Sequence, residues 1–235
     1  MPEGKTERRV ALVTGASRGI GAAVAVELAR LGCHVVLTAR TQGGLEETDD
    51  AIRAVGGAAT LLPLDLTDGA QLDLLGPSLH HRFGRLDVLV GNAASLGRLT
   101  PIPHIHDRDF SATMEVNLAA SWRLIRTTAP LLLAGPAGRA VFVTSRIVGQ
   151  PTAYWGLYGT TKAALEHLVL VWAEETRTTR LRINLFDPGV VATRLRAEAM
   201  PGEDSSTLVK PRDVAPALAA LCAEAESRHG EVVRF

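Results

Sequence analysis

The sequence predicts an α/β fold in which a doubly wound parallel sheet of about seven strands is flanked by helices. Short apolar runs alternate with longer amphipathic stretches along the whole chain, which is the order expected when helices connect parallel strands. The short runs are apolar throughout, as is typical of strands that helices cover on both faces. No linker, internal repeat or low-complexity tract divides the chain, so we expect residues 1–235 to form a single domain.

The strand candidates are short runs rich in Val, Leu and Ile. We expect seven strands, in chain order, at residues 10–13, 35–37, 59–62, 86–90, 141–143, 183–186 and 232–233. The stretches between them are long enough for helices, and some begin with helix-entry residues such as Asp68 and Pro211. We expect helices at residues 19–31, 41–55, 68–83, 107–133, 158–177 and 211–225.

Two loops interrupt this alternation where strands end, at residues 94–106 and 190–210. Ligands of open α/β sheets bind outside the carboxyl ends of the strands. We therefore expect these loops to form the walls of a substrate pocket.

Composition excludes several classes of partner. The formal net charge is zero, so no basic field attracts nucleic acid or an anionic membrane. No run approaches the roughly 18 apolar residues of a membrane span, and residues 1–9 lack the apolar stretch of a signal peptide. Cys33 and Cys222 have no metal-ligand spacing and suggest no disulfide framework. We expect a cytoplasmic protein in which both thiols are small buried groups.

A glycine-rich turn follows the first strand and opens the first helix. Small residues here permit a tight turn and leave the N–H groups of the helix N-terminus free for a pyrophosphate. The glycine spacing differs from the generic G-x-G-x-x-G pattern, and a plain structural turn is the alternative. The residues expected to contact a dinucleotide are Gly15, Ser17, Arg18, Gly19, Ile20 and Gly21.

The end of the second strand indicates which dinucleotide is bound. NAD sites place an acidic residue about twenty positions beyond the glycines, but residues 38–41 contain no carboxylate. Arg40, together with Arg18, suits a 2′-phosphate. The alternative is that Arg40 is a solvated surface arginine. NADP(H) is therefore favoured, with NAD(H) as the second choice.

Further cofactor contacts are expected at other strand ends. Asp65 can accept a hydrogen bond from the adenine amino group and Leu66 can offer its backbone; the alternative is that Asp65 caps the helix near Asp68. Asn92 and Ala93 allow close approach to the adenosine and the ribose, although Asn92 is equally suited to tying adjacent strands. After the sixth strand, we expect contacts to the nicotinamide carboxamide from Pro188, Gly189 and Val191, and to the carboxamide or the pyrophosphate from Thr193.

Tyr158 and Lys162 lie four residues apart and therefore share one helix face. An isolated tyrosine has a pKa of about 10; a nearby ammonium is expected to lower it and make the phenol an acid–base catalyst. Lys162 can also bind the nicotinamide ribose. Such a pair often occurs by chance, but Ser145 ends the fifth strand nearby and can polarise a carbonyl oxygen. Tyr154 has a tyrosine, not a lysine, four positions later, so the acid–base role belongs to Tyr158.

These motifs resemble those of the short-chain dehydrogenase/reductase family over nearly the whole chain. The matching positions are the T-G-x-x-x-G-x-G turn at residues 14–21, Asn117, Ser145, the Y-x-x-x-K pair Tyr158 and Lys162, and Pro188 with Gly189. The resemblance implies a Rossmann-type fold and a catalytic tetrad.

The resemblance assigns a role to each tetrad residue. Tyr158 would be the acid–base, Ser145 the carbonyl anchor and Lys162 the ribose binder that tunes the tyrosine. Asn117 would hold a water that links Lys162 to solvent, although an amide inside a helix more often satisfies a local kink.

Two residues depart from the family pattern. Arg146 follows the serine, where a small residue is usual, and Asp187 precedes Pro188, where a neutral residue is common. Arg146 is expected to narrow the pocket, to attract an acidic substrate or to form a structural salt bridge.

The expected activity is NADPH-dependent reduction of a ketone or 3-oxoacyl carbonyl to a secondary alcohol, and the resemblance also suggests a 3-oxoacyl carrier-protein reductase. One alternative is an NAD(P)-linked alcohol dehydrogenase acting on a sugar, steroid or dihydrodiol. Another is a non-catalytic nucleotide-sensing protein. No metal is expected, because His104 and His106 have no third ligand.

A homodimer is expected, with a homotetramer as the alternative. Apolar residues of the helices that begin near residues 107 and 158 would supply its surface: Trp122, Leu124, Leu165, Leu168 and Trp172.

Overall fold

A seven-stranded parallel sheet in the order β3-β2-β1-β4-β5-β6-β7 forms the centre of the protein. The computed structural model describes residues 8–235, so the polar segment expected at residues 1–9 lies mostly outside the described residues. All seven expected strands are confirmed. They are β1 (Val10–Thr14), β2 (His34–Ala39), β3 (Ala58–Pro63), β4 (Val88–Gly91), β5 (Arg139–Val143), β6 (Arg182–Asp187) and β7 (Glu231–Arg234).

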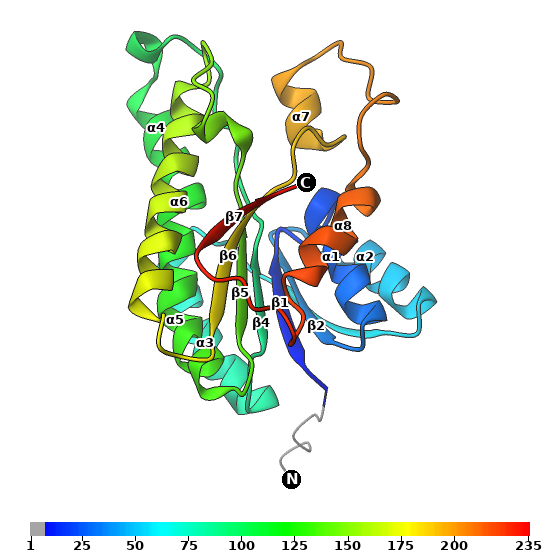
Figure 1. Ribbon diagram of the computed structural model, residues 1–235. Helices are drawn as coiled ribbons and strands as arrows, with labels where there is room; N and C mark the ends of the chain where they lie inside the picture. The colour runs from blue at the N-terminus through cyan, green and yellow to red at the C-terminus, as the bar shows by residue number, and fades with distance from the viewer. Residues whose placement is uncertain (1–7) are drawn as a thin grey trace.

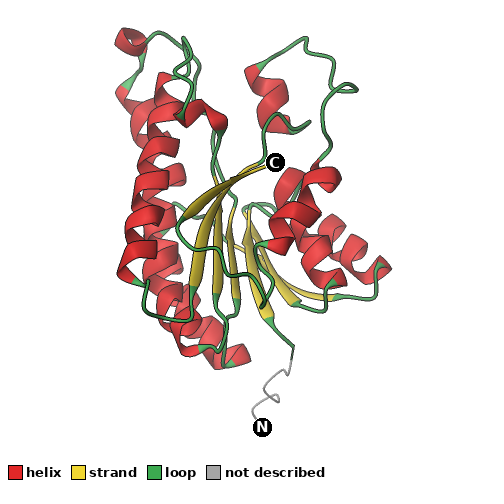
Figure 2. Cartoon of the chain, in the orientation of Figure 1, coloured by secondary structure: helices red, strands yellow, loops and turns green. Residues whose placement is uncertain are grey.

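Helices cover both faces of the sheet (Figures 1 and 2). On one face lie α1 (Gly19–Arg30), α2 (Gln42–Ala54) and α8 (Pro211–Ala220). On the other lie α3 (Gly69–Phe83), α4 (Asp107–Met114), α5 (Ala120–Ala134) and α6 (Gly156–Glu175). The predicted Rossmann-type α/β fold is therefore confirmed.

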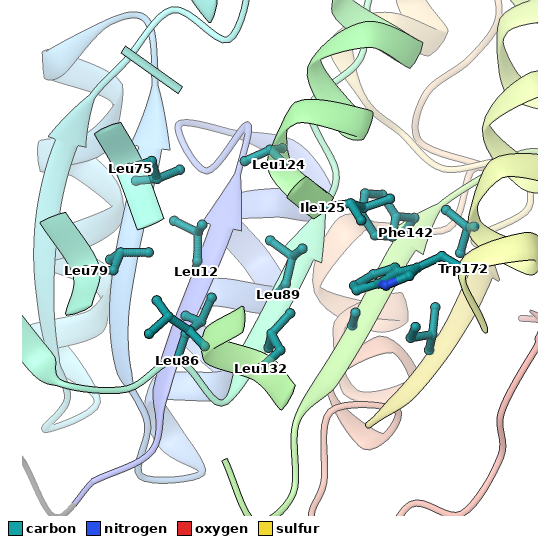
Figure 3. Packing of buried hydrophobic residues seen from close by; sticks show 14 of the residues in the cluster. Leu12, Leu75, Leu79, Leu86, Leu89, Leu124, Ile125, Leu132, Phe142 and Trp172 are labelled. Atoms are coloured by element: carbon teal, nitrogen blue, oxygen red, sulfur yellow. The ribbon is translucent and has the colours of Figure 1, made fainter. Parts of the chain in front are cut away.

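Two apolar clusters, one on each face of the sheet, form the core. Figure 3 shows the cluster under α3, α5 and α6, where Leu12 and Leu89 of the sheet meet Leu79 and Leu132 of the helices. Because both faces of β1, β4 and β5 are covered, every residue of these strands is buried. This explains why their sequences are apolar except at two strand ends, where Thr14 and Arg139 are buried polar residues.

The helix expected at residues 107–133 is interrupted. A π-helical turn, Glu115–Ala119, separates α4 from α5. A π-helical turn inserts one extra residue into a helix and often marks a functional site. Two further differences concern the C-terminal half. The loop expected at residues 190–210 contains a short helix, α7 (Arg194–Ala199), and the helix expected to reach residue 225 ends at Ala220.

Most of the apolar residues expected to form a dimer surface lie instead in the hydrophobic core. Leu124, Leu165 and Trp172 are buried in the cluster under α5 and α6, and Leu168 packs against it. Of the five residues named, Trp122 is the exposed one, with 44% of its surface accessible. Helical periodicity finds the apolar face of a helix, but it does not tell a core from an interface. The two cysteines are buried, as expected.

Within residues 8–235, no helix has the length and apolar character needed to cross a membrane.

Close packing of α3 on α5 requires a glycine. A Cβ at position 76 would lie 2.0 Å from the Thr127 carbonyl oxygen, whereas a Cβ at position 43 meets nothing within 4 Å. We expect Gly76→Ala to lower the free energy of unfolding by about 3 kcal/mol, because the helices must move apart. The matched control Gly43→Ala should leave it unchanged or raise it by up to about 1 kcal/mol. Urea denaturation measures both; equal stabilities of the two variants would contradict this packing.

Candidate active site

The glycine turn between β1 and α1 has the geometry of a dinucleotide cradle. Gly15 and Gly19 have φ angles of +64° and +59°, which favour glycine. A Cβ at Gly21 would lie 2.3 Å from the Gly15 carbonyl oxygen, and one at Gly15 would lie 2.9 Å from the Ala93 Cα. The close approach of neighbouring backbone atoms therefore requires glycine at positions 15 and 21. A Cβ at Gly19 would meet only the Thr193 side chain, at 3.6 Å, so glycine is favoured there by its positive φ.

The N-terminus of α1 is suited to an anion. Arg18 precedes the helix without a side-chain cap, and the first turn carries no acidic residue. Uncapped N–H groups at a helix N-terminus attract phosphate. Thr193 approaches from the segment after β6, since its methyl group lies 3.6 Å from a Cβ built on Gly19. The residues present therefore fit the pyrophosphate of a dinucleotide.

Asn92 has a structural role at the end of β4. Its amide Nδ2 donates to the Thr14 carbonyl oxygen at 2.9 Å and to the Gly15 carbonyl oxygen at 3.3 Å. The backbone N–H groups of Asn92 and Ala93 donate to the Thr14 hydroxyl. The tie between adjacent strands is thus present, and it holds the glycine turn in position. Contacts of Asn92 and Ala93 with a cofactor stay a prediction.

Arg18 and Arg40 are both exposed at this edge of the sheet. Asp65 lies near Arg40: hydrogen bonds from Thr67 hold the pKa of Asp65 below its usual value, and the charge of Arg40 acts in the same direction. Asp68, not Asp65, caps α3, by accepting a hydrogen bond from the Gln71 N–H. The proposed cap role of Asp65 is therefore wrong.

The helix α6 carries Tyr158 and Lys162 into the protein. Their exposed fractions are 6% and 2%. The Lys162 ammonium donates a 2.8 Å hydrogen bond to the Val143 carbonyl oxygen at the end of β5. Ser145 lies two residues beyond this carbonyl, and its hydroxyl accepts from the Ile147 N–H at the start of the 3-10 turn Arg146–Val148. The structure thus ties the three predicted catalytic residues to one strand end.

Burial sets the ionisation of both groups. Burial, followed by the negative charge of Asp187, raises the pKa of Tyr158 above its ordinary value. Burial also lowers the pKa of Lys162 to about 8, and the nearby carboxylate of Glu166 opposes this change. Lys162 donates to a backbone carbonyl, with its Nζ 5.9 Å from the centre of the Tyr158 ring. The expectation that Lys162 lowers the pKa of Tyr158 is therefore not met, because burial and the charge of Asp187 raise it.

Asn117 lies in the π-helical turn and fastens the loop after β4. Its Oδ1 accepts from the Ser95 N–H at 2.7 Å, while its Nδ2 donates to the Ser95 carbonyl and the Thr161 hydroxyl, each at 2.9 Å. Thr161 lies between Tyr158 and Lys162 on α6. These three hydrogen bonds make the Asn117 side chain a clamp between the loop after β4 and α6; its role as a water ligand stays a prediction.

The two expected wall loops meet over Tyr158. Leu96 and Leu99 come from the loop after β4, and Leu195 and Ala199 come from α7. Together with Ile147 and Trp155, they form a small apolar cluster around Tyr158. Figure 1 shows α7 and the loop before α4 at the same end of the sheet, beyond the ends of the strands. The surroundings of the phenol are therefore apolar.

Two polar residues near Ser145, Thr144 and Glu166, were not predicted as site residues from the sequence. The Thr144 hydroxyl donates to the Glu166 carboxylate at 2.5 Å. Ser145, Glu166 and Asp187 line a cavity of about 510 Å³. Arg146 forms no ion pair with the described residues; its guanidinium lies 2.8 Å from a Cβ built on Gly189. The proposed salt bridge of Arg146 is therefore not formed.

The segment after β6 positions the remaining predicted residues. The Gly189 N–H donates to Asp187, Val191 pairs with Val209, and the Thr193 hydroxyl caps α7 by accepting from the Arg196 N–H. Contacts of Pro188 and its neighbours with a nicotinamide stay a prediction. Among residues 8–235 no three His, Cys, Asp or Glu side chains are grouped so that they could hold a metal ion.

Comparisons with known proteins agree on one family. The family model described as short chain dehydrogenase matches residues 9–204. The uncharacterized oxidoreductase YciK of Escherichia coli K12 is 35% identical over 211 residues, covering 88% of this chain and 83% of its own. Benzil reductase ((S)-benzoin forming) IRC24 of Saccharomyces cerevisiae is 32% identical over 202 residues, covering 81% and 74%. A chain from Escherichia coli CFT073, solved in complex with NADPH, superposes with a TM-score of 0.91 at 33% identity, covering 96% and 95%.

The clamp role of Asn117 can be tested by removing its amide. We expect Asn117→Ala to lower the free energy of unfolding by about 2–3 kcal/mol, because the Ser95 N–H loses its partner. Amide hydrogen exchange at Ser95 should accelerate. The control Ser121→Ala removes a single hydrogen bond, to the Asn117 carbonyl, and should cost about 1 kcal/mol without opening the loop. Unchanged exchange at Ser95 in Asn117→Ala would show that other contacts hold this loop.

Proposed function

The chain belongs to the short chain dehydrogenase family of oxidoreductases, and from this we propose that it is an NADPH-dependent reductase of an apolar ketone or 3-oxoacyl carbonyl. The product would be a secondary alcohol. The observation that carries the proposal is the placement of Tyr158. Its phenol lies among apolar side chains, on the helix that Lys162 ties to the strand end before Ser145.

Each residue of the site would have a separate role in the reduction. Bound NADPH would supply the hydride that reaches the carbonyl carbon. Ser145 would hold the carbonyl oxygen through its hydroxyl, and Tyr158 would donate the proton to that oxygen. Burial keeps Tyr158 in the phenol form that donation requires. Lys162, whose pKa is about 8, would remain largely an ammonium at neutral pH and bind the ribose hydroxyls.

Preference for NADP(H) is supported by the charge at the end of β2. Arg40 follows β2 directly, and Arg18 lies in the glycine turn. Both are exposed arginines that a 2′-phosphate can reach, and a guanidinium binds such a group through two parallel hydrogen bonds. The relative solved with NADPH supports the same cofactor.

The substrate proposal follows from the cluster over Tyr158. Its side chains from the loop after β4, the 3-10 turn and α7 carry no charge. An apolar group beside the carbonyl would bury surface there, at about 25 cal/mol per Å². The similarity to a benzil reductase supports a carbonyl flanked by apolar groups. A 3-oxoacyl chain, as in a 3-oxoacyl carrier-protein reductase, presents similar chemistry.

A cytoplasmic homodimer, with a homotetramer as the alternative, remains part of the proposal. Trp122 of α5 and Val171 of α6 expose 44% and 42% of their surface, and a second copy could cover them.

Removing the phenolic hydroxyl tests the proton donor. We expect Tyr158→Phe to lower the turnover of ketones by at least about 100-fold, because general-acid catalysis is lost. NADPH binding, measured by fluorescence titration, should remain. The matched control is Tyr154→Phe, at a tyrosine with 59% of its surface exposed, and it should keep most of the activity. Turnover by Tyr158→Phe near the level of the unaltered protein would exclude the assigned role. NADPH binding without turnover of any ketone, 3-oxoacyl thioester or quinone would instead favour a nucleotide sensor.

Reversing the charge after β2 tests the cofactor preference. We expect Arg40→Asp to lower the ratio of kcat/KM for NADPH to that for NADH by about 10-fold or more, because the 2′-phosphate loses a charged partner. Arg108→Asp changes an exposed arginine of α4 and should leave the ratio as it was. An unchanged ratio in Arg40→Asp would mean that the 2′-phosphate is bound elsewhere.

A further inference from the structure

Thr48 is a buried threonine of α2 whose hydroxyl reaches the glycine turn between β1 and α1. Its exposed fraction is 4%. The hydroxyl donates to the Ala16 carbonyl oxygen at 2.8 Å, and the Gly44 carbonyl oxygen, one turn earlier on α2, lies at 3.1 Å. Because a hydroxyl has a single hydrogen, the nearer Ala16 carbonyl is its main acceptor. Thr48 therefore joins α2 to a different segment of the chain, whereas helix threonines often bond within their own helix.

The first turn of α2 packs against the same part of the glycine turn. A Cβ at Gly44 would lie 2.8 Å from the Ser17 Cβ and 3.1 Å from the Ser17 carbonyl oxygen. A Cβ at the neighbouring Gly43 would meet nothing within 4 Å. Glycine is therefore needed at position 44, and not at position 43, for α2 to approach Ser17 this closely.

The hydrogen bond from Thr48 sets the direction of one peptide group in the turn. A peptide group is planar and trans, so its C=O and its N–H point in opposite directions. Because the Ala16 carbonyl points to Thr48, the Ser17 N–H points away from α2. Among residues 8–235 no backbone carbonyl accepts a hydrogen bond from this N–H. It is therefore an oriented donor at the helix N-terminus that fits a pyrophosphate.

Other contacts hold the glycine turn from the sheet. The Ala16 N–H donates to the Thr38 carbonyl oxygen of β2 at 3.1 Å. The Asn92 amide of β4 donates to the Gly15 carbonyl oxygen. If the Thr48 hydroxyl is removed, these contacts remain and keep the turn in its place. The expected effect is thus a local change in the orientation of the peptide group after Ala16.

We propose that Thr48 is a positioning residue for the dinucleotide: its hydroxyl holds the Ala16 carbonyl and so aims the Ser17 N–H at the pyrophosphate. The inference rests on the proposed function, because the turn must bind NADP(H). Since Thr48 acts through the backbone of the turn, its loss should weaken binding of the dinucleotide and spare the chemical step. NADPH and NADH share the pyrophosphate, so both should be weakened alike.

Thr128 of α5 provides a matched control. It is also a buried helix threonine, and its hydroxyl donates to the Leu124 carbonyl oxygen one turn earlier at 2.6 Å. Thr48→Val and Thr128→Val both keep a β-branched side chain and remove a buried hydroxyl. The bond to the glycine turn is what distinguishes the two positions. Thr48→Ser keeps the hydroxyl and should restore binding.

We expect Thr48→Val to raise the Kd of NADPH and that of NADH by about 10-fold each, because a buried hydrogen bond that orients the donor is lost. The KM for NADPH should rise in parallel, while kcat at saturating NADPH stays within about 2-fold. Thr48→Ser and Thr128→Val should bind both dinucleotides as the unaltered protein does. Fluorescence titration measures the Kd values, and steady-state kinetics measure KM and kcat.

A second pair of variants tests the same positioning with Thr48 intact. The methyl group of Gly44→Ala would push Ser17 aside, so both dinucleotides should bind about 10-fold more weakly. Gly43→Ala should bind them as before. This pair decides the inference if Thr48→Val does not fold.

Equal NADPH binding by Thr48→Val and Thr128→Val would overturn the inference. A loss confined to NADPH would also overturn it, because the effect would then lie at the 2′-phosphate. If the unaltered protein binds NADPH but reduces no carbonyl, the proposed function fails, and the binding comparison still decides the role of Thr48. If it binds neither dinucleotide, the turn is no cofactor cradle and the inference is wrong as well.

Discussion

The hydrogen bond from the buried Lys162 ammonium to the Val143 carbonyl is the constraint on which the site depends. A buried ammonium must be paired with acceptors, and the last carbonyl of β5 is the acceptor that the structure supplies. This bond fixes α6 against the strand end that continues into Ser145. It also places Tyr158, one turn earlier on α6, under the apolar cluster formed by the two loops. The catalytic arrangement is thus a consequence of packing one helix on one strand.

Electrostatics in this buried site favour a neutral phenol. Desolvation disfavours both tyrosinate and ammonium, so Tyr158 holds its proton while Lys162 holds its own less firmly. The Asn117 clamp adds rigidity by joining the loop after β4 to α6 through Thr161. The phenol form of Tyr158 is the one that carries a transferable proton.

The sequence predicted the strands and the glycine turn because their signals are local. Apolar runs reveal buried strands. Glycine is required at positions 15 and 21 because a Cβ there would clash with nearby backbone atoms. The sequence did not predict the π-helical turn around Asn117, since one extra residue in a helix leaves no periodic signal. The short helix α7 spans less than two turns, too few for an amphipathic pattern. Periodicity likewise assigned Trp172 to a surface, although it lies in the core. The partner of Lys162 is a backbone carbonyl, which residue types alone do not reveal.

A crystal structure with NADPH and an unreactive ketone analogue would test the central claim most directly. The account predicts that the Tyr158 hydroxyl lies within hydrogen-bond reach of the carbonyl oxygen, at about 2.6–3.2 Å, with Ser145 on the same oxygen and the C4 face of the nicotinamide beside the carbonyl carbon. A complex in which the carbonyl oxygen is bound away from Tyr158, with the nicotinamide facing another group, would contradict it.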